Sequence, residues 1–399
     1  MRAERKKREI FAPMNPRPTI HTITERELQL PAPVVHTLSG GIPLYEVRMG
    51  TQDALRLDVI FRAGRSRERK KLAARATARL LREGTRRYSG AAIAEQTDFL
   101  GAYLNSTAGM DHARISILCL SRHLEQLLPL LADMLTEPTF PEEELQAYIR
   151  RNCQRLSVDL SQSEVVAYRE ITSLIFGAEH PYGYNSTEAL YRSLKREDLL
   201  EHFRAHYRAG NCVLFLGGKT EPRHVEAVDR LLAAALPEGN SPHPQLPPHD
   251  YTPQRRSFPL PDAAQTSVRI GRPLFPRRHP DYFGFTVLNT LFGGYFGSRL
   301  MTNIREGQGL TYNISSTMEF MVFDGCFYVA TEVANGQAEH TIREVFAEME
   351  KLCEEPVSEA ELGMVKNYLT GNMLNMIDGP FNTLDALKSL TLQGLRPTH

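Results

Sequence analysis

The sequence predicts an α+β fold made of two similar halves, and two observations support this. Strand-like and helical segments follow one another in the same order in residues 39–236 and in residues 257–399. Between them lies a segment, 237–256, in which six prolines fall between Pro237 and Pro253. Proline cannot continue a helix or a central strand, so this segment is predicted to be an interdomain linker. Residues 1–38 are predicted to be an N-terminal extension.

In the first half, apolar residues at every second position predict strands, and a three-to-four-residue apolar period predicts helices. Ser89 is a typical helix N-cap and Gly101 a typical helix end. The expected elements are strands at 43–48 and 55–62, helices at 72–84 and 89–100, a strand around Ile115, a helix at 124–134, a long helix opened by acidic residues 142–144, a helix at 197–207 and a strand at 212–216.

The second half repeats this order. A Glu-Pro pair precedes a long helix in both halves, Glu137-Pro138 in the first and Glu355-Pro356 in the second, and indicates a duplicated domain. The expected elements are a strand at 266–270, a helix at 281–292, strands at 310–318 and 326–332, an amphipathic helix at 342–352 and a helix opened by the capping box at 358–361. The first half has a further helix and strand beyond this point, so the second domain is expected to be truncated.

Composition limits the possible partners and location. The 399 residues carry a formal net charge of zero, which gives no electrostatic reason to expect nucleic acid or an acidic membrane as a partner. No apolar run approaches transmembrane length. The start of the chain is basic, but prolines interrupt it where a signal peptide needs a continuous apolar stretch. A cytoplasmic location is therefore expected. The five cysteines are widely spaced and are expected to be reduced thiols.

Residues 72–85 read Leu-Ala-Ala-Arg-Ala-Thr-Ala-Arg-Leu-Leu-Arg-Glu-Gly-Thr. This segment resembles the zinc-binding helix of the pitrilysin/insulinase family of peptidases, the inverzincins, whose pattern is H-x-x-E-H followed after four residues by Gly-Thr. Counting back from Gly84, the two ligand histidines fall on Arg75 and Arg79, and the general-base glutamate falls on Ala78.

The metal site implied by the resemblance is therefore degenerate. Arginine offers no lone pair and keeps its proton near neutral pH, so Arg75 and Arg79 cannot ligate zinc. The family's third ligand, a glutamate, should fall near Leu156, but no glutamate occurs from residue 145 to residue 163. All three ligands are missing, and no metal or other cofactor is expected in this chain. Arg75 and Arg79 are expected to form surface or interface ion pairs instead.

Other segments extend the resemblance. Residues 63–68 (Ala-Gly-Arg-Ser-Arg-Glu), 101–105 (Gly-Ala-Tyr-Leu-Asn) and 180–183 (His-Pro-Tyr-Gly) are similar to family motifs. The resemblance implies two homologous peptidase-like domains, each with helices packed on a mainly antiparallel sheet.

The second half contains one segment that retains chemistry. Residues 298–312 hold Ser-Arg-Leu, Ile-Arg-Glu and Gly-Leu-Thr-Tyr, similar to the family pattern S-R-L-x-x-x-I-R-E-x-x-G-L-x-Y. Arg305 and Tyr312 match the family's arginine and tyrosine that reach over the zinc site. A guanidinium and a phenol can both donate hydrogen bonds to a carbonyl that becomes an oxyanion.

The resemblance implies a non-catalytic subunit of a heterodimeric zinc metallopeptidase. A homologous, zinc-bearing subunit would be the partner, peptides would be the substrates, and this chain would supply Arg305 and Tyr312 in trans. Alone, it should hydrolyse nothing and could form a homodimer. A different class of protein is the alternative: a purely structural or peptide-binding scaffold subunit without turnover.

Weaker candidates are best explained structurally. His202 and His206 are spaced i, i+4, but Glu201, Arg204 and Arg208 predict a solvated helix face rather than the zinc site of a stand-alone hydrolase. The glycine-rich residues 293–297 lack the lysine and serine of a phosphate-binding loop and are expected to form a tight turn. His180 is expected to be a structural hydrogen-bonding group.

Overall fold

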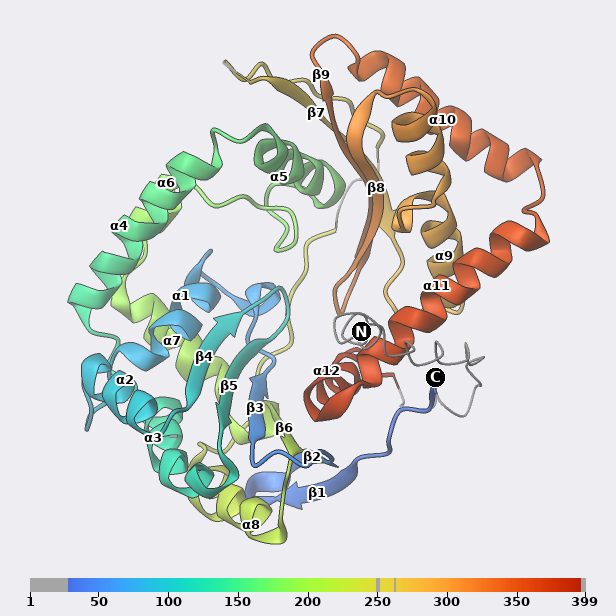
Figure 1. Ribbon diagram of the computed structural model, residues 1–399. Coiled ribbons are helices and arrows are strands. Elements are labelled where there is room, and N and C mark those ends of the chain that lie inside the picture. The colour runs from blue at the N-terminus through green and yellow to red at the C-terminus, as the bar shows by residue number, and fades with distance from the viewer. Residues whose placement is uncertain (1–27, 249–251, 262, 396–399) are drawn as a thin grey trace, which may run out of the picture.

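The computed structural model describes residues 28–248, 252–261 and 263–395. Figure 1 shows two sheets, each with helices along one side, which correspond to the two halves predicted from the sequence. Described residues between 237 and 264 form neither a helix nor a strand. Within the described ranges, no helix is both long and apolar enough to cross a membrane.

The first half contains a six-stranded sheet in the order β1-β2-β6-β3-β5-β4. Strands β2 and β6 run parallel, and the other neighbours run antiparallel. The strands are β1 (Val34–Leu38), β2 (Ile42–Arg48), β3 (Leu55–Phe61), β4 (Tyr103–Ala108), β5 (Ala113–Cys119) and β6 (Cys212–Gly218). Strand β1 lies within the segment 1–38 that was predicted to be an extension, so the first sheet begins before residue 39.

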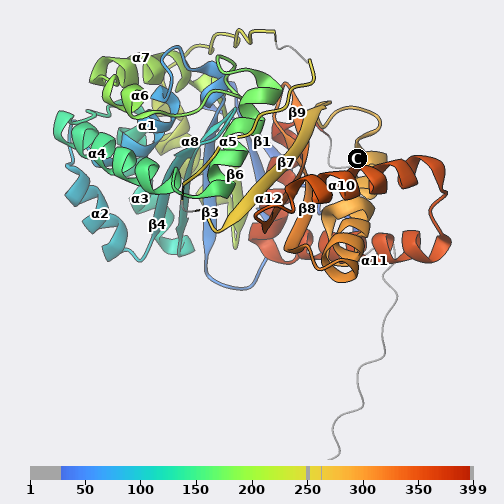
Figure 2. The same cartoon turned by 90° about the horizontal axis from the view of Figure 1, so that it is seen from above.

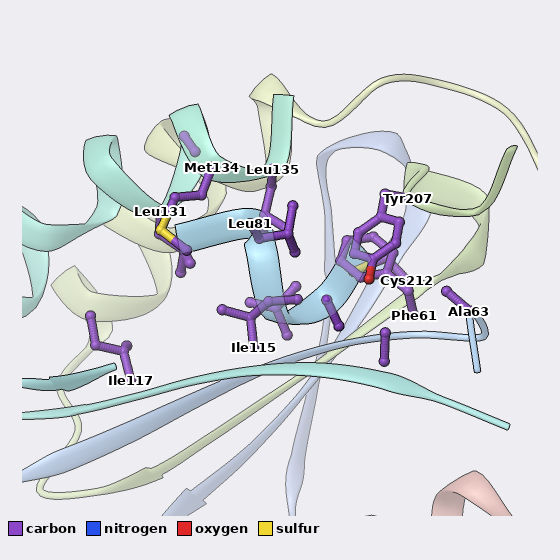
Figure 3. Packing of buried hydrophobic residues seen from close by; sticks show 14 of the residues in the cluster. Phe61, Ala63, Leu81, Ile115, Ile117, Leu131, Met134, Leu135, Tyr207 and Cys212 are labelled. Carbon is purple, nitrogen blue, oxygen red and sulfur yellow. The ribbon is translucent and has the colours of Figure 1, made fainter. Parts of the chain in front are cut away.

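Helices cover one face of this sheet. They are α1 (Ala73–Leu80), α2 (Gly90–Phe99), α3 (Leu124–Thr136), α4 (Glu142–Asp159), α6 (Glu188–Arg192), α7 (Arg196–His206) and α8 (Pro222–Leu231), with α5 (Ser163–Phe176) leading toward the second half. Figure 3 shows the core between sheet and helices, where Ile115 and Ile117 of β5 lie opposite Leu131 and Leu135 of α3. As predicted, the side chain of Ser89 accepts a hydrogen bond from the amide of Ala92 at the start of α2.

The second half contains a three-stranded antiparallel sheet in the order β7-β9-β8. Its strands are β7 (Gln265–Leu274), β8 (Thr311–Phe320) and β9 (Gly325–Ala334). Its helices are α9 (Tyr282–Asn289), α10 (Ala338–Glu354), α11 (Glu359–Ile377) and α12 (Gly379–Leu392), and π-helical segments occupy Thr290–Gly294 and Met301–Gly307.

Each sheet receives a helix from the other half on its second face. Helix α12 of the second half packs on β2 and β6, where Leu384 and Leu387 join Val47, Ile60 and Phe215. Helix α5 of the first half packs on β7 and brings a second apolar cluster to that sheet (Figure 2). Burying one leucine side chain contributes about 2 kcal/mol, so these exchanged helices join the halves firmly.

Polar contacts reinforce both junctions. On the α5 side, the hydroxyl groups of Tyr168 and Tyr328 donate to the Glu319 carboxylate at 2.9 and 2.8 Å. Asp111 of the first half accepts hydrogen bonds from the Tyr182 hydroxyl at 2.5 Å and from the amide of Val322 in the second half at 2.8 Å. These bonds fix the direction in which the two sheets face each other.

On the α12 side, the junction contains a buried charge. The side chain of Asp58 on β3 is fully buried and lies 2.8 Å from the ammonium of Lys388 on α12. Arg114 and Arg56 lie 3.0 and 3.5 Å from the same carboxylate. Burial raises the pKa of Asp58, but Lys388, Arg114 and Arg56 together outweigh that effect and hold the pKa below its usual value. Asp58 is therefore a charged anchor between the halves.

We expect Asp58→Asn to lower the free energy of unfolding by about 3 kcal/mol, because it removes the fully buried carboxylate that Lys388, Arg114 and Arg56 share. Lys388 and Arg56 would keep only the more exposed carboxylate of Asp385. Urea denaturation followed by circular dichroism measures this. The control is Arg192→Ala, which removes an exposed i, i+4 ion pair with Glu188 and should change stability by less than about 0.5 kcal/mol. Equal effects of the two substitutions would contradict the anchor role.

The same anchor predicts a pH dependence. Because the folded-state pKa of Asp58 is lowered, its contribution is complete above the unfolded-state pKa of about 3.9 and is lost as the pH falls through the lower folded-state value. The stability difference between the wild-type chain and Asp58→Asn should therefore be constant near neutral pH and shrink below about pH 4. A difference that grows on acidification would contradict the sign of the shift.

Candidate functional site

The start of α1 is held by residues from other parts of the chain. Glu68 accepts a hydrogen bond from the amide of Ala74 at 3.0 Å and another from the Tyr184 hydroxyl. The Tyr184 hydroxyl in turn accepts one from the amide of Leu72 at 3.0 Å. Leu72 has a left-handed backbone, with φ of 74°, which costs about 1–2 kcal/mol. The helix therefore begins at a strained residue held by a buried carboxylate–phenol pair.

The loop before α1 is equally constrained. The guanidinium of Arg65 stacks 3.4 Å above the centre of the Tyr184 ring and donates to the carbonyl oxygen of Tyr184. Burial raises the pKa of Glu68 and lowers that of Arg65. A Cβ atom on Gly64 would lie 2.4 Å from the backbone of Asp111, so only glycine allows this close approach. The family-like motif at 63–68 thus has a structural role in placing α1.

The three positions that the resemblance aligns with the family's zinc-site residues, Arg75, Ala78 and Arg79, all lie on α1. Arg75 is exposed, Arg79 is half-buried and Ala78 is fully buried. The carbonyl oxygen of Ala78 accepts a hydrogen bond from the Ser106 hydroxyl of β4 at 2.6 Å. Among the described residues, neither Arg75 nor Arg79 has a carboxylate within ion-pair distance or a side-chain hydrogen bond, so the ion pairs expected of them are not found in this part of the chain.

Helix α4 packs against α1 and carries Leu156, near which the resemblance places the family's third ligand. Leu156 is buried in the apolar core of the first half. Burial lowers the pKa of Arg79, and the neighbouring charges of Arg82 and of Arg151 on α4 lower it further. Tyr148, also on α4, is 4% exposed, and its hydroxyl has no hydrogen-bond partner among the described residues. Within the same residues, no group of three or more His, Cys, Asp and Glu side chains is placed to hold a metal ion.

Arg305 lies in the π-helical segment Met301–Gly307. Its guanidinium carbon lies 4.6 Å from the centre of the Phe296 ring, and one nitrogen lies 3.5 Å from the carboxylate of Glu306. A cation above an aromatic face is attracted by the ring quadrupole, which restricts the orientation of the guanidinium. About a third of the Arg305 side chain remains exposed, at 32%, so part of its donor group is available to a ligand.

Tyr312 lies near the start of β8 and is 90% exposed. The pairing of β8 with β9 shifts between Thr311 and Ile314. Such a bulge changes the direction of the side chains within it. Gly309, with φ of 65°, makes the turn that precedes the strand. The phenol of Tyr312 is thus presented to the surroundings rather than packed into the core.

The two histidines of α7 are buried, so the prediction of a solvated face is wrong for them. His202 is hydrogen-bonded to the carbonyl oxygen of Ala63 at 3.0 Å, and His206 to the hydroxyl of Ser241 at 2.6 Å. Burial lowers the pKa of His202 to about 3 and that of His206 to about 4. Both rings are therefore neutral packing groups near neutral pH, and the exposed face of α7 belongs to Glu201 and other charged residues.

The remaining candidates have structural roles. His180 accepts a hydrogen bond from the amide of Tyr182 at 3.1 Å and stacks on Phe176. A Cβ atom on Gly293 would lie 2.6 Å from the amide nitrogen of Ser316. The glycine therefore permits close packing of a helix on β8 and is not part of a phosphate cradle.

The five cysteines are free, and burial raises the pKa of Cys119 and Cys326 to about 12.

Two family models match the chain in succession. Residues 50–173 match the model described as Insulinase (Peptidase family M16), and residues 193–369 match the model described as Peptidase M16 inactive domain. An uncharacterized zinc protease of Rickettsia felis is 25% identical over 300 residues, which cover 73% of this chain and 70% of the relative. Mitochondrial-processing peptidase subunit beta of Mus musculus is 25% identical over 318 residues, covering 74% and 63%.

Solved structures extend the similarity to the whole fold. A peptidase M16 inactive domain from Pseudomonas fluorescens superposes with a TM-score of 0.78 at 25% identity, covering 90% of this chain and 88% of that one. A protease from Helicobacter pylori superposes with a TM-score of 0.84 at 16% identity over 92% and 90%, which shows the fold alone. The predicted two-domain α+β architecture is confirmed, and the chain belongs to the M16 (pitrilysin/insulinase) peptidase family, without the H-x-x-E-H motif.

Proposed function

We propose that this chain is the non-catalytic subunit of a two-chain zinc metallopeptidase, acting in the cytoplasm. A homologous subunit with an intact H-x-x-E-H helix would hold the zinc, and this chain would close the peptide chamber and supply Arg305 and Tyr312 in trans. The observation that carries the proposal is a contrast within one sequence. Arg75, Ala78 and Arg79 have replaced the zinc-site residues, while the segment that holds Arg305 and Tyr312 keeps its pattern.

The two donors suit the chemistry of peptide hydrolysis. Zinc in the partner would supply an activated water and polarise the scissile carbonyl. As negative charge develops on the carbonyl oxygen, the phenol of Tyr312 and the guanidinium of Arg305 would each donate a hydrogen bond to it. One preorganised donor of this kind lowers the barrier by about 3 kcal/mol.

The surroundings of these residues support a role toward another molecule. Tyr312 is 90% exposed at a strand bulge, an arrangement that contributes little to the stability of its own domain. Arg305 is oriented by Phe296 and Glu306 but remains partly exposed. The name of the murine relative, a peptidase subunit, supports pairing with a homologous chain. In the absence of that partner we expect a homodimer.

A scaffold subunit without turnover is the second candidate. A chain of Complex III2 from Candida albicans superposes with a TM-score of 0.70 at 15% identity, so the fold also occurs in an assembly that is not named as a peptidase. A scaffold has no need of an exposed tyrosine and a partly exposed arginine at the family positions, and this favours the peptidase pair. An adjacent reading frame that encodes an H-x-x-E-H homologue would favour it further.

We expect the purified chain to retain no stoichiometric zinc, because Arg75, Ala78 and Arg79 provide no ligand atom. Metal analysis by mass spectrometry after dialysis against a weak chelator measures this. Restoring all the family's zinc-site residues by Arg75→His, Ala78→Glu, Arg79→His and Leu156→Glu together provides a control for the measurement. One tightly held zinc per wild-type chain would contradict the proposal.

We expect Tyr312→Phe in the assembled pair to lower kcat about a hundredfold. Size-exclusion chromatography should show that the variant still forms the pair. Arg305→Lys should be similarly impaired, because a compact ammonium does not reproduce the planar guanidinium. Steady-state cleavage of a quenched fluorescent peptide is the measurement. The matched control is Tyr368→Phe on α11, which removes a partly exposed phenol elsewhere in the second half. Full activity of Tyr312→Phe combined with Arg305→Ala would support the scaffold instead.

A further inference from the structure

We propose that the degenerate metal site of this chain binds an anion, the carboxylate of an acidic peptide. Arg75 and Arg79 of α1, Arg151 of α4 and the hydroxyl of Tyr148 form this site, which we call the arginine site. The inference deepens the proposed function, since the ligand would be part of a substrate peptide. It assigns binding to the helix that has lost its metal ligands.

Arg75 and Arg79 concentrate positive charge at the arginine site. Arg75 and Arg79 are one helical turn apart on α1 and repel each other. Nearby arginines have carboxylate partners: Arg82 lies 3.6 Å from Glu83, Arg86 lies 3.3 Å from Glu137, and Arg87 pairs with Asp133. Among the described residues, no carboxylate lies within ion-pair distance of Arg75, Arg79 or Arg151. An anion would remove the repulsion that this chain leaves uncompensated.

The hydroxyl of Tyr148 is the second feature of the arginine site. Tyr148 lies on α4, which packs on α1, and its buried hydroxyl has no hydrogen-bond partner within the described ranges. The buried hydroxyl of Tyr207 has none there either, but only burial acts on its ionisation, whereas the charges of Arg75 and Arg79 act on that of Tyr148. A buried hydroxyl without a partner close to cations requires a specific explanation. A bound carboxylate supplies that explanation, because it would accept a hydrogen bond from the phenol while pairing with the guanidinium groups.

The acidic side chains around the arginine site do not pair with its arginines or accept a hydrogen bond from Tyr148. Glu68 acts on the ionisation of Tyr148, but its carboxylate already accepts hydrogen bonds from the amide of Ala74 and from the Tyr184 hydroxyl. The charge of Glu83 raises the pKa of Arg79, but the Glu83 carboxylate lies within ion-pair distance of Arg82, at 3.6 Å, and not of Arg79. Arg65 adds a further buried cation close to Arg75. The balance of charge at the site is positive.

The chemistry favours a single carboxylate over a larger polyanion. Guanidinium groups bind carboxylates with two parallel hydrogen bonds. The chain as a whole has no net charge, so no broad positive field is available to attract nucleic acid. The site is formed by two helices of the first half, the half that would face a peptide in the proposed chamber. An aspartate or glutamate side chain of that peptide fits these properties.

The test is fluorescence anisotropy of the isolated, full-length chain with a labelled peptide that carries a central run of glutamates. The same peptide with glutamines is the reference. We expect the acidic peptide to bind at least about tenfold more tightly, with an affinity that falls as salt is added. Arg75→Gln combined with Arg79→Gln should remove this preference, and Arg75→Lys combined with Arg79→Lys should restore it only in part.

Two controls separate a binding role from a structural one. Arg230→Gln removes an exposed positive charge on α8, where Arg230 pairs with Glu125, and should leave binding unchanged. Tyr148→Phe removes a hydroxyl that has no hydrogen-bond partner among the described residues, so it should weaken binding severalfold without lowering the melting temperature. Equal affinity for both peptides, or unchanged binding by the double glutamine variant, would overturn the proposal. Inorganic phosphate should compete less effectively than the unlabelled acidic peptide. Equal competition by the two would overturn the assignment of a peptide carboxylate as the ligand.

The outcome is independent of catalysis. Binding to the isolated chain needs neither the partner nor turnover, so loss of the glutamate preference tests the arginine site alone. In the reconstituted pair, the double glutamine variant should raise KM for the acidic peptide and leave kcat unchanged, whereas Tyr312→Phe should lower kcat. An inactive pair whose isolated subunit still binds the acidic peptide would refute the proposed function and keep the arginine site.

Discussion

The architecture depends on one constraint: both sheets have two apolar faces, and each half covers only one of them with its own helices. In the first sheet, the core face packs against α1 and α3, and the other face presents Ile60 and Phe215, which α12 of the second half covers. In the second sheet, α5 of the first half covers the corresponding face. Apolar strands exposed on one side would invite aggregation, so the halves are obliged to exchange helices. The buried Asp58–Lys388 pair then selects one arrangement of the two, because an ion pair tolerates less displacement than an apolar contact.

Helix α1 is held in place by contacts that need no metal ion. In a site whose helix is held by zinc, the loss of ligands would also loosen the helix. Here the start of α1 is held by Glu68 and Tyr184, its middle by the bond from Ser106 to the carbonyl oxygen of Ala78, and its sides by α4 and α7. The position of the helix is therefore fixed by residues other than Arg75 and Arg79.

The sequence predicted those elements whose signals are local. The strand expected at 55–62 is β3 (Leu55–Phe61), and the helix expected at 89–100 is α2 (Gly90–Phe99), because alternation and capping operate within a few residues. Strand β1 was missed because its residues are largely exposed and lack clear alternation. The burial of His202 was mispredicted because it is determined by Ala63, which is 139 residues away in the chain. That the Tyr148 hydroxyl finds no partner within the described part of the chain has no signal in the sequence, since it follows from the packing of α4 on α1.

The identity of the residues that replaced the zinc ligands bears on what the site now does. Any apolar or amide side chain at these positions would also prevent metal binding. At a half-buried position such as Arg79, an uncharged residue would in addition avoid the free-energy cost of desolvating a cation. Arginine stays charged under these conditions, and two of them one turn apart add mutual repulsion. In the proposed arginine site, two guanidinium groups therefore favour an anion held by donors over a cation held by lone pairs. Cations and a buried hydroxyl that find no partner among the described residues lower the stability of the free chain, and a ligand that supplies the acceptor accounts for all of these features together.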